Sequence, residues 1–146
     1  MKPEFRVYGV KTPLIRDGDD LASVILEAAK KSPAGGIQDG DILVIAESPV
    51  ATAEGRAVPL DRVVPSERAR ELAGRYRIDP RLAEVVLGES DAIVGGVAGF
   101  LLSLKRGTLL PNAGVDLSNT PPGTALPLPK DPDGSALRIR KAMEER

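Results

Sequence analysis

The segment 112–119, Asn-Ala-Gly-Val-Asp-Leu-Ser-Asn, holds two amides, a hydroxyl, a carboxylate and a glycine within eight residues. Such oxygen-rich groups suit a hard cation at Asp116, with Ser118 and Asn119 in reach of a bound ligand. Taken alone, the pattern is more typical of a polar turn whose Asp and Asn side chains bond their own backbone. One carboxylate is also too few for a tight magnesium site, unless another carboxylate or substrate phosphates complete it.

The residue types that the sequence lacks narrow the chemistry. There is no Cys, which excludes disulfides, thiolate nucleophiles and thiolate metal sites. There is no His, which excludes a Ser-His-Asp triad, an imidazole base and a His-bound zinc. Carboxylates, hydroxyls, Lys, Arg and backbone amides remain, and their oxygens select magnesium, manganese or calcium. Phosphate chemistry stays open, because nucleotide and metal bring most of the charge involved.

Two further segments carry polar groups where a ligand could bind. Glu47 and Ser48 follow a predicted buried strand, and ligands gather beyond the carboxyl ends of strands in open α/β sheets. An ordinary polar strand end explains these two residues equally well. In the segment 12–16, Arg16 offers a planar donor fork to a phosphate, although a strand exit fixed by Pro13 is the simpler explanation.

Helices are predicted where apolar residues recur at helical spacing after a capping residue. Asp19 and Asp20 are interpreted as such caps rather than as a functional carboxylate pair. The predicted helices are 21–31, a stretch opened by Ser66 and ending near Tyr76, a stretch opened by Asp79-Pro80 and ending before Gly88, and a last helix capped by 133–135.

Strands are predicted from alternating or continuous apolar runs. They are 5–10, the run 42–46 buried on both faces, and a hairpin of 100–105 with 108–110. Residues 49–56 indicate a loop or short strand, the glycine pairs 35–36 and 95–96 indicate turns, and the proline-rich stretch 121–132 indicates an extended connector. This irregular interleaving predicts an α+β fold with a mixed β-sheet and flanking helices.

Length and charge limit the kinds of partner. The 146 residues favour one domain over residues 1–146, and 20 basic against 21 acidic residues demand no basic face for nucleic acid. Aromatic residues make up 3%, which leaves few platforms for stacking bases. Apolar runs are far shorter than the roughly 18 residues of a membrane span, and residues 1–10 lack a signal-peptide core. We therefore expect a cytoplasmic protein without membrane or nucleic-acid partners.

Six strings in consistent order resemble one family along essentially the whole chain. They are PLIRDGDDL (13–21), DGDILVIAES (39–48), AEGR (53–56), PSERA (65–69), NAGVDLSN (112–119) and DPDGSA (131–136). The family is that of the coenzyme F420-0:gamma-glutamyl ligases, which attach L-glutamate to a deazaflavin coenzyme precursor with GTP. The resemblance implies the N-terminal part of that family's fold.

The resemblance also implies roles for particular residues. Asp116 matches the family's ligand for a divalent metal, Mg²⁺ or Mn²⁺. The residues that match its GTP-binding positions are Thr12, Pro13, Leu14, Ile15, Glu47, Ser48, Thr52 and Asn119. Some members have a Lys, rather than Thr52, in contact with the nucleotide. The family's mechanism phosphorylates the precursor's carboxylate, after which the amine of glutamate displaces the phosphate. No catalytic residue is assigned.

Members of that family continue where this chain stops, and their further portion carries a second metal-binding Asp segment. The resemblance therefore implies an N-terminal piece, a split-gene subunit or a shortened relative that has lost activity. A homodimer, or a partner that supplies the C-terminal portion, is expected, because a half-domain exposes apolar faces. The alternative is a non-catalytic nucleotide-binding or assembly module that kept the scaffold.

Overall fold

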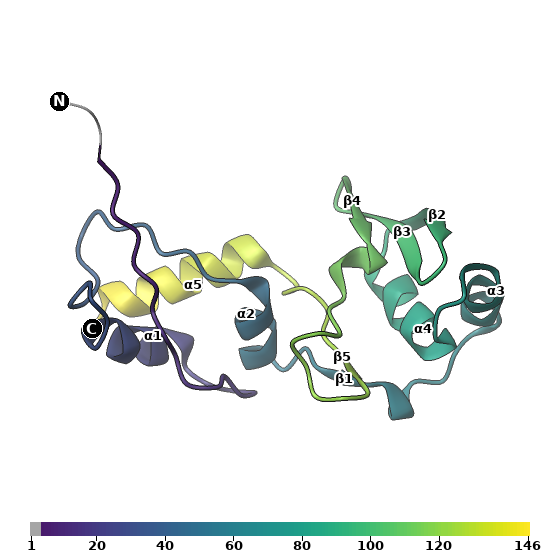
Figure 1. Ribbon diagram of the computed structural model, residues 1–146, viewed down its shortest axis with the longest axis horizontal. Coiled ribbons are helices and arrows are strands. Elements are labelled where there is room, and N and C mark those ends of the chain that lie inside the picture. Colours follow the sequence, from purple (N-terminus) through teal and green to yellow (C-terminus); the bar gives the residue numbers. More distant parts are fainter. Residues whose placement is uncertain (1–3) are drawn as a thin grey trace. The chain divides into compact units, whose positions relative to one another are not determined.

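The computed structural model describes residues 4–146, which fold into helices and antiparallel sheets (Figure 1). The predicted α+β class is confirmed. The chain divides into two compact units. We call residues 56–129 the central unit, and residues 4–55 with 130–146 the terminal unit. None of the helices formed by residues 4–146 has the length and apolar character needed to cross a membrane.

The terminal unit is built from three helices around a small core. Asp20 caps the first helix and accepts a hydrogen bond from the Ser23 backbone N–H at 3.3 Å, as predicted. The helices are α1 (Leu21–Lys30), α2 (Glu47–Ala53) and α5 (Pro132–Glu144). The core consists of Leu21, Ile25 and Val50, with Ile15, Ile37, Ile45, Ala53, Ile139 and Met143 packed against it.

Both strands predicted in the terminal unit are wrong. Residues 5–10 and 42–46 form no strand, and the side chains of Ile42 and Val44 are 84% and 87% exposed. An apolar run becomes a strand only beside a hydrogen-bonded neighbour. No β-ladder formed by residues 4–146 includes either segment.

Two further predictions for this unit need correction. Residues 47–53 form helix α2 rather than a loop or strand, because Pro49 lies in the first turn, where a helix does not use the backbone N–H. Helix α5 begins at Pro132, earlier than predicted, because Asp131 is its cap and accepts from the Gly134 N–H at 3.1 Å.

The helices of the central unit begin where the sequence predicts. The Ser66 side chain accepts from the Ala69 N–H at 3.1 Å, and Asp79 accepts from the Arg81 N–H at 2.8 Å. Pro80 occupies the first helical position. These helices are α3 (Glu67–Tyr76) and α4 (Pro80–Glu89).

Two antiparallel sheets complete the central unit. The predicted hairpin is confirmed as β3 (Phe100–Lys105) and β4 (Thr108–Pro111). The first strand of that sheet, β2 (Ala92–Val97), is not predicted, because its glycine pair resembles a turn. A Cβ on Gly96 would lie 2.6 Å from the Phe100 carbonyl oxygen, so close approach of the chains requires glycine there. The second sheet pairs β1 (Val58–Pro59) with β5 (Thr124–Ala125), a short strand inside the predicted connector.

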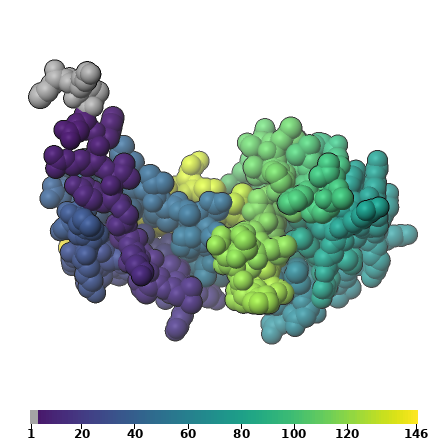
Figure 2. Space-filling view, viewed as in Figure 1, coloured from purple at the N-terminus to yellow at the C-terminus, as the bar shows by residue number. Residues whose placement is uncertain are grey.

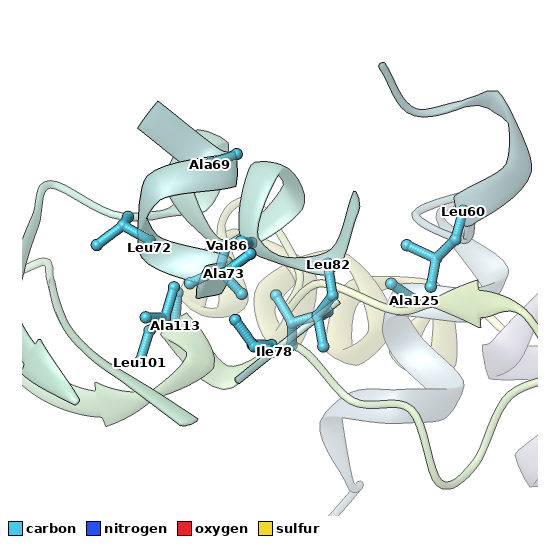
Figure 3. Packing of buried hydrophobic residues seen from close by; sticks show 12 residues of the cluster. Leu60, Ala69, Leu72, Ala73, Ile78, Leu82, Val86, Leu101, Ala113 and Ala125 are labelled. Atoms are coloured by element: carbon cyan, nitrogen blue, oxygen red, sulfur yellow. The ribbon is translucent and has the colours of Figure 1, made fainter. Parts of the chain in front are cut away.

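The core of the central unit joins helices α3 and α4 to the sheet and to the loop that follows β4 (Figure 3). Its buried members include Leu72, Ala73, Leu82, Val86, Leu101, Ala113 and Val115. Because Ala113 and Val115 belong to this core, their packing holds the segment 112–116 in place. The core thus fixes the position of the loop that carries Asp116.

Candidate functional site

The segment that leads to Asp116 is held in an unusual backbone conformation. Asn112 and Ala113 have φ angles of +49° and +54°, in the left-handed region. The buried Asn112 side chain stabilises this turn, because its Oδ1 accepts from the Leu101 backbone N–H at 2.9 Å. The loop is therefore tied to strand β3 by a buried hydrogen bond.

Gly114 allows this loop to pack closely against the side chain of Leu128. Its φ is +75°, and an added Cβ would lie 2.6 Å from the Leu128 Cδ1 atom. Gly114→Ala should therefore combine backbone strain with overpacking. Gly107→Ala is the matched control, since Gly107 also has φ +75° but open space around it. We expect Gly114→Ala to lower the free energy of unfolding by about 1–3 kcal/mol more than the control does, as measured by urea denaturation. Equal losses would contradict this packing account.

The carboxylate of Asp116 is surrounded by donors from its own turn. Asp116 Oδ1 accepts from the Ser118 backbone N–H at 2.8 Å and from its hydroxyl at 2.6 Å. Asp116 Oδ2 accepts from the Asn119 side-chain amide at 2.9 Å. The Asp116 backbone also exchanges hydrogen bonds with Leu126 at 2.8 and 2.9 Å. The structure thus brings together the three polar residues that the sequence singled out, in the hydrogen-bonded turn that the sequence also indicated.

These hydrogen bonds determine the charge of Asp116. The Ser118 hydroxyl and backbone N–H, with the Asn119 amide, lower the pKa of Asp116 to about 2. The carboxylate is therefore ionised at neutral pH. A carboxylate must be in this charged state to bind a cation.

The lowered pKa of Asp116 predicts a specific pH dependence of stability. A group whose pKa is depressed by folding stabilises the fold above its unfolded value and loses that effect as the pH falls through its folded value. We expect the stability difference between the wild type and Asp116→Asn to shrink as the pH falls from about 5 to about 2, as measured by urea unfolding at each pH. A difference that stays constant over this range would contradict the assigned shift.

By itself, Asp116 would be only one ligand of a metal site. Across residues 4–146, no cluster of three or more acidic side chains could hold a metal ion. Magnesium is often bound by one or two carboxylates, with substrate phosphates and waters as the other ligands. The ionised Asp116 fits such a site as one carboxylate ligand, and nucleotide phosphates would have to supply others.

The predicted nucleotide-binding residues 12–15 lie in the terminal unit, in a segment without regular structure. Thr12 and Ile15 are half-buried, whereas Pro13 and Leu14 are exposed. Ile15 packs against the Leu21, Ile25 and Val50 cluster and so fixes the end of this segment.

Glu47, Ser48 and Thr52 all lie on helix α2 of the terminal unit. The first two residues form its first turn and do not end a strand as predicted. Val50, between them and Thr52, belongs to the cluster that Ile15 contacts, so the structure ties α2 and residues 12–15 to one core. Asp116 and Asn119 belong to the central unit, so the predicted site residues divide between the two units.

A pocket in the terminal unit, lined by both polar and apolar residues, was missed by sequence reasoning. It has a volume of about 220 Å³ and is lined in part by Glu54, Ser135 and Arg138. Glu54 Oε1 accepts from the Ser135 hydroxyl at 2.5 Å and from Arg138 at 3.0 Å. Because 81 residues separate Glu54 from Ser135, local patterns cannot connect them. The only signal is that 53–56 and 131–136 both carry the family resemblance.

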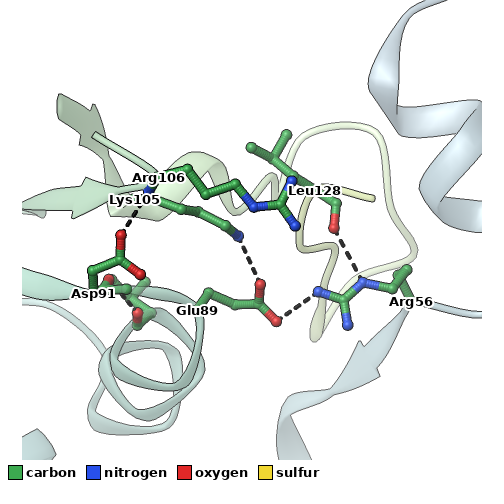
Figure 4. Close-up of polar contacts among 8 residues, drawn as sticks. Arg56, Glu89, Asp91, Lys105, Arg106 and Leu128 are labelled. Atoms are coloured by element: carbon green, nitrogen blue, oxygen red, sulfur yellow. Dashed lines mark hydrogen bonds and ion pairs between the residues drawn. The ribbon is translucent and has the colours of Figure 1, made fainter. Parts of the chain in front are cut away.

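A largely buried ion cluster in the central unit was also missed (Figure 4). Glu89 accepts from Arg56 at 2.6 Å and from Lys105 at 2.7 Å, and Arg56 also donates to the Leu128 carbonyl at 3.1 Å. Burial alone would raise the pKa of Glu89, but the hydrogen bonds from the two cations outweigh it and lower this pKa. The cluster links the end of α4 to β3 and to the segment around Leu128, which packs beside Gly114.

Residues 9–146 match the model of the protein family described as F420-0:Gamma-glutamyl ligase. The chain belongs to this ligase family. The family resemblance of the six strings is thereby confirmed, and the match includes Asp116, Asn119 and the candidate residues of the terminal unit.

Curated relatives agree with this membership. The chain is 44% identical to the coenzyme F420:L-glutamate ligase of Methanothermobacter thermautotrophicus, over 91% of this chain and 53% of the relative. The enzymes of the same name from Methanopyrus kandleri and Archaeoglobus fulgidus are 43% and 38% identical, over 90% and 97% of this chain and 50% and 53% of theirs. The chain thus spans about half the length of the curated relatives it matches.

Proposed function

We propose that this chain is the nucleotide-binding portion of a ligase that joins L-glutamate, in gamma linkage, to a deazaflavin coenzyme F420 precursor with GTP. The observation that carries this proposal is the similarity to coenzyme F420:L-glutamate ligases along nearly the whole chain. The ionised carboxylate of Asp116, in a loop anchored by the core, supports it.

In the proposed reaction, a carboxylate oxygen of the precursor attacks the γ-phosphorus of GTP, which releases GDP and leaves an acyl phosphate. The amine of glutamate then attacks the acyl carbon, phosphate leaves, and the amine gives up a proton as the amide forms. A bound Mg²⁺ or Mn²⁺ would neutralise charge on the β- and γ-phosphates. Asp116 would hold that ion.

The other candidate residues are assigned to nucleotide binding. Asn119 donates to Asp116 and would lie beside the phosphates that share its metal. Residues 12–15, with Glu47, Ser48 and Thr52 on α2, are proposed to contact the nucleotide from the terminal unit. Since Thr52 carries no charge where some members have Lys, this position would contribute less to phosphate binding than a Lys does.

The test is an assay of glutamate-dependent GTP hydrolysis, together with the mass of the product. The chain is assayed alone and with the half of the Methanothermobacter relative that it does not match. We expect turnover, and a product heavier by one glutamyl residue, only when that half is present. Absence of turnover in both samples, with folded protein and a formed complex, would overturn the ligase proposal.

The half-length match motivates the alternative, a non-catalytic nucleotide-binding or assembly module. Calorimetric titration with GTP, with and without Mn²⁺, separates the two. Tight metal-dependent binding that Asp116→Ala abolishes would support the ligase portion, and weak or metal-independent binding would support the module.

A further inference from the structure

Two segments of the terminal unit have strand-like sequences but no strand partner among residues 4–146. Within residues 5–10, the apolar Phe5 and Val7 alternate with Arg6 and Tyr8, and residues 42–46 are apolar throughout. All β-ladders of the described chain lie in the central unit, and helices are the only regular structure that residues 4–55 and 130–146 form. We call 5–10 and 42–46 the unpaired segments.

Burial along 42–46 already has the period of a strand. Ile42 and Val44 are 84% and 87% exposed, whereas Leu43 is 37% exposed and Ile45 is half-buried. Ile45 packs on the Leu21, Ile25 and Val50 cluster. Successive side chains of a strand point to opposite faces. In the same way, Leu43 and Ile45 lie on the side of the core, whereas Ile42 and Val44 lie on the exposed side.

The segment 5–10 exposes apolar side chains in the same way. Phe5 and Val7, two residues apart, are 85% and 94% exposed, whereas Val10 is half-buried. Figure 2 shows this part of the chain, in purple, at the surface of the terminal unit. Phe5 and Val7 therefore add exposed apolar side chains to those of Ile42 and Val44, and larger exposed apolar patches mark interaction sites.

The relatives that this chain matches are about twice as long as the part they share with it. The alignment takes in 90–91% of this chain but only 50–53% of the first two relatives, so about half of each has no counterpart among the described residues. We propose that polypeptide equivalent to that half pairs with the unpaired segments as β-strands and covers Phe5, Val7, Ile42 and Val44. The backbone of 42–46 offers sheet hydrogen bonds, and its outward side chains offer an apolar face. The pairing holds whether that half is a continuation of the chain or a separate subunit, and it does not depend on the proposed reaction.

The test combines co-expression with hydrogen exchange. The 146-residue chain is produced with and without the unmatched half of the Methanothermobacter or the Methanopyrus relative as a separate polypeptide. We expect a complex in which the amides of 42–46 and 5–10 exchange at least about 10-fold more slowly than in the chain alone. GTP and turnover are not needed, so protected amides without ligase activity would overturn the proposed function and leave this inference standing.

A matched pair of substitutions locates the surface. Val44→Lys places a charge on the proposed interface, whereas Val64→Lys places one on an equally exposed valine of the central unit, 83% against 87% exposed. We expect Val44→Lys to weaken the complex at least about 10-fold and Val64→Lys to change it less than about 2-fold. Thermal melts of the isolated variants should match the wild type, because both side chains are exposed.

Three results would overturn the inference. The first is that neither the Methanothermobacter half nor the Methanopyrus half co-purifies with the chain. The second is a complex in which the unpaired segments exchange as fast as before. The third is equal protection of these segments at high concentration of the chain alone, which would assign the surface to a second copy.

Discussion

Glu89→Ala should lower the free energy of unfolding of the protein by about 3–5 kcal/mol. The side chains of Arg56, Glu89 and Lys105 are only 14%, 20% and 11% exposed, and Glu89 is the shared acceptor of both cations. Its removal leaves two positive charges close together in a poorly hydrated place. Loss of an acidic group from the last residue of α4 gains back a few tenths of a kcal/mol at the helix dipole, which is too little to alter the result.

Glu27→Ala is the control for Glu89→Ala. Glu27 pairs with Lys30 at a similar distance, 2.7 Å, but both side chains are more than 60% exposed. An exposed pair of this kind contributes little to stability, because water screens its charges. Chemical denaturation should show a much larger loss in the free energy of unfolding for Glu89→Ala than for Glu27→Ala. A loss for Glu89→Ala as small as that for Glu27→Ala would contradict the role of burial in this cluster.

Asp116→Ala should weaken metal-dependent GTP binding about 100-fold, because it removes the charged oxygen ligand of the described chain's proposed metal site. The measurement is calorimetric titration of GTP in the presence and absence of Mn²⁺. It is made on the chain together with the relative's unmatched half, so that the missing ligands are supplied.

Asp116→Asn distinguishes a metal ligand from a residue that only stabilises the turn. The amide oxygen of Asn still accepts hydrogen bonds from Ser118, as Asp116 Oδ1 does, but it carries no charge. If Asp116 is a metal ligand, we expect the Asp116→Asn variant to bind GTP as weakly as the Asp116→Ala variant does. Wild-type affinity in Asp116→Asn would mean that the side chain serves the turn alone.

The elements that the sequence predicted well are those whose signals are local. Caps at Asp20, Ser66 and Asp79 lie within three residues of the N–H groups they accept from, so helix starts could be predicted from spacing. The hairpin of β3 and β4 is similarly local, because its turn at 106–107 joins neighbouring strands.

The elements that the sequence did not predict depend on distant neighbours. The run 42–46 has a strand's composition, but a strand requires a partner that residues 4–146 do not supply. Helix α2 and strand β2 were not predicted, because α2 contains Pro49 and β2 contains Gly95 and Gly96, and such residues usually interrupt regular structure.

The same division applies to the candidate site. The contacts of Asp116 with Ser118 and Asn119 span at most three residues and follow from the sequence pattern. The Glu89 cluster does not, because Arg56 and Lys105 lie 33 and 16 residues away from Glu89 and only the fold brings them together. The oxygen-rich segment 112–119 is compatible with a metal ligand at Asp116, but the assignment of the metal and nucleotide roles depends on the family resemblance.

Whether Asp116 binds a metal ion together with GTP is tested by the manganese anomalous signal in crystals of the chain, with the relative's unmatched half, grown with GTP and Mn²⁺. We predict a peak in direct contact with a carboxylate oxygen of Asp116 and with the nucleotide phosphates. Bound nucleotide with no peak there, and with Asp116 still accepting its hydrogen bonds from Ser118 and Asn119, would contradict the account.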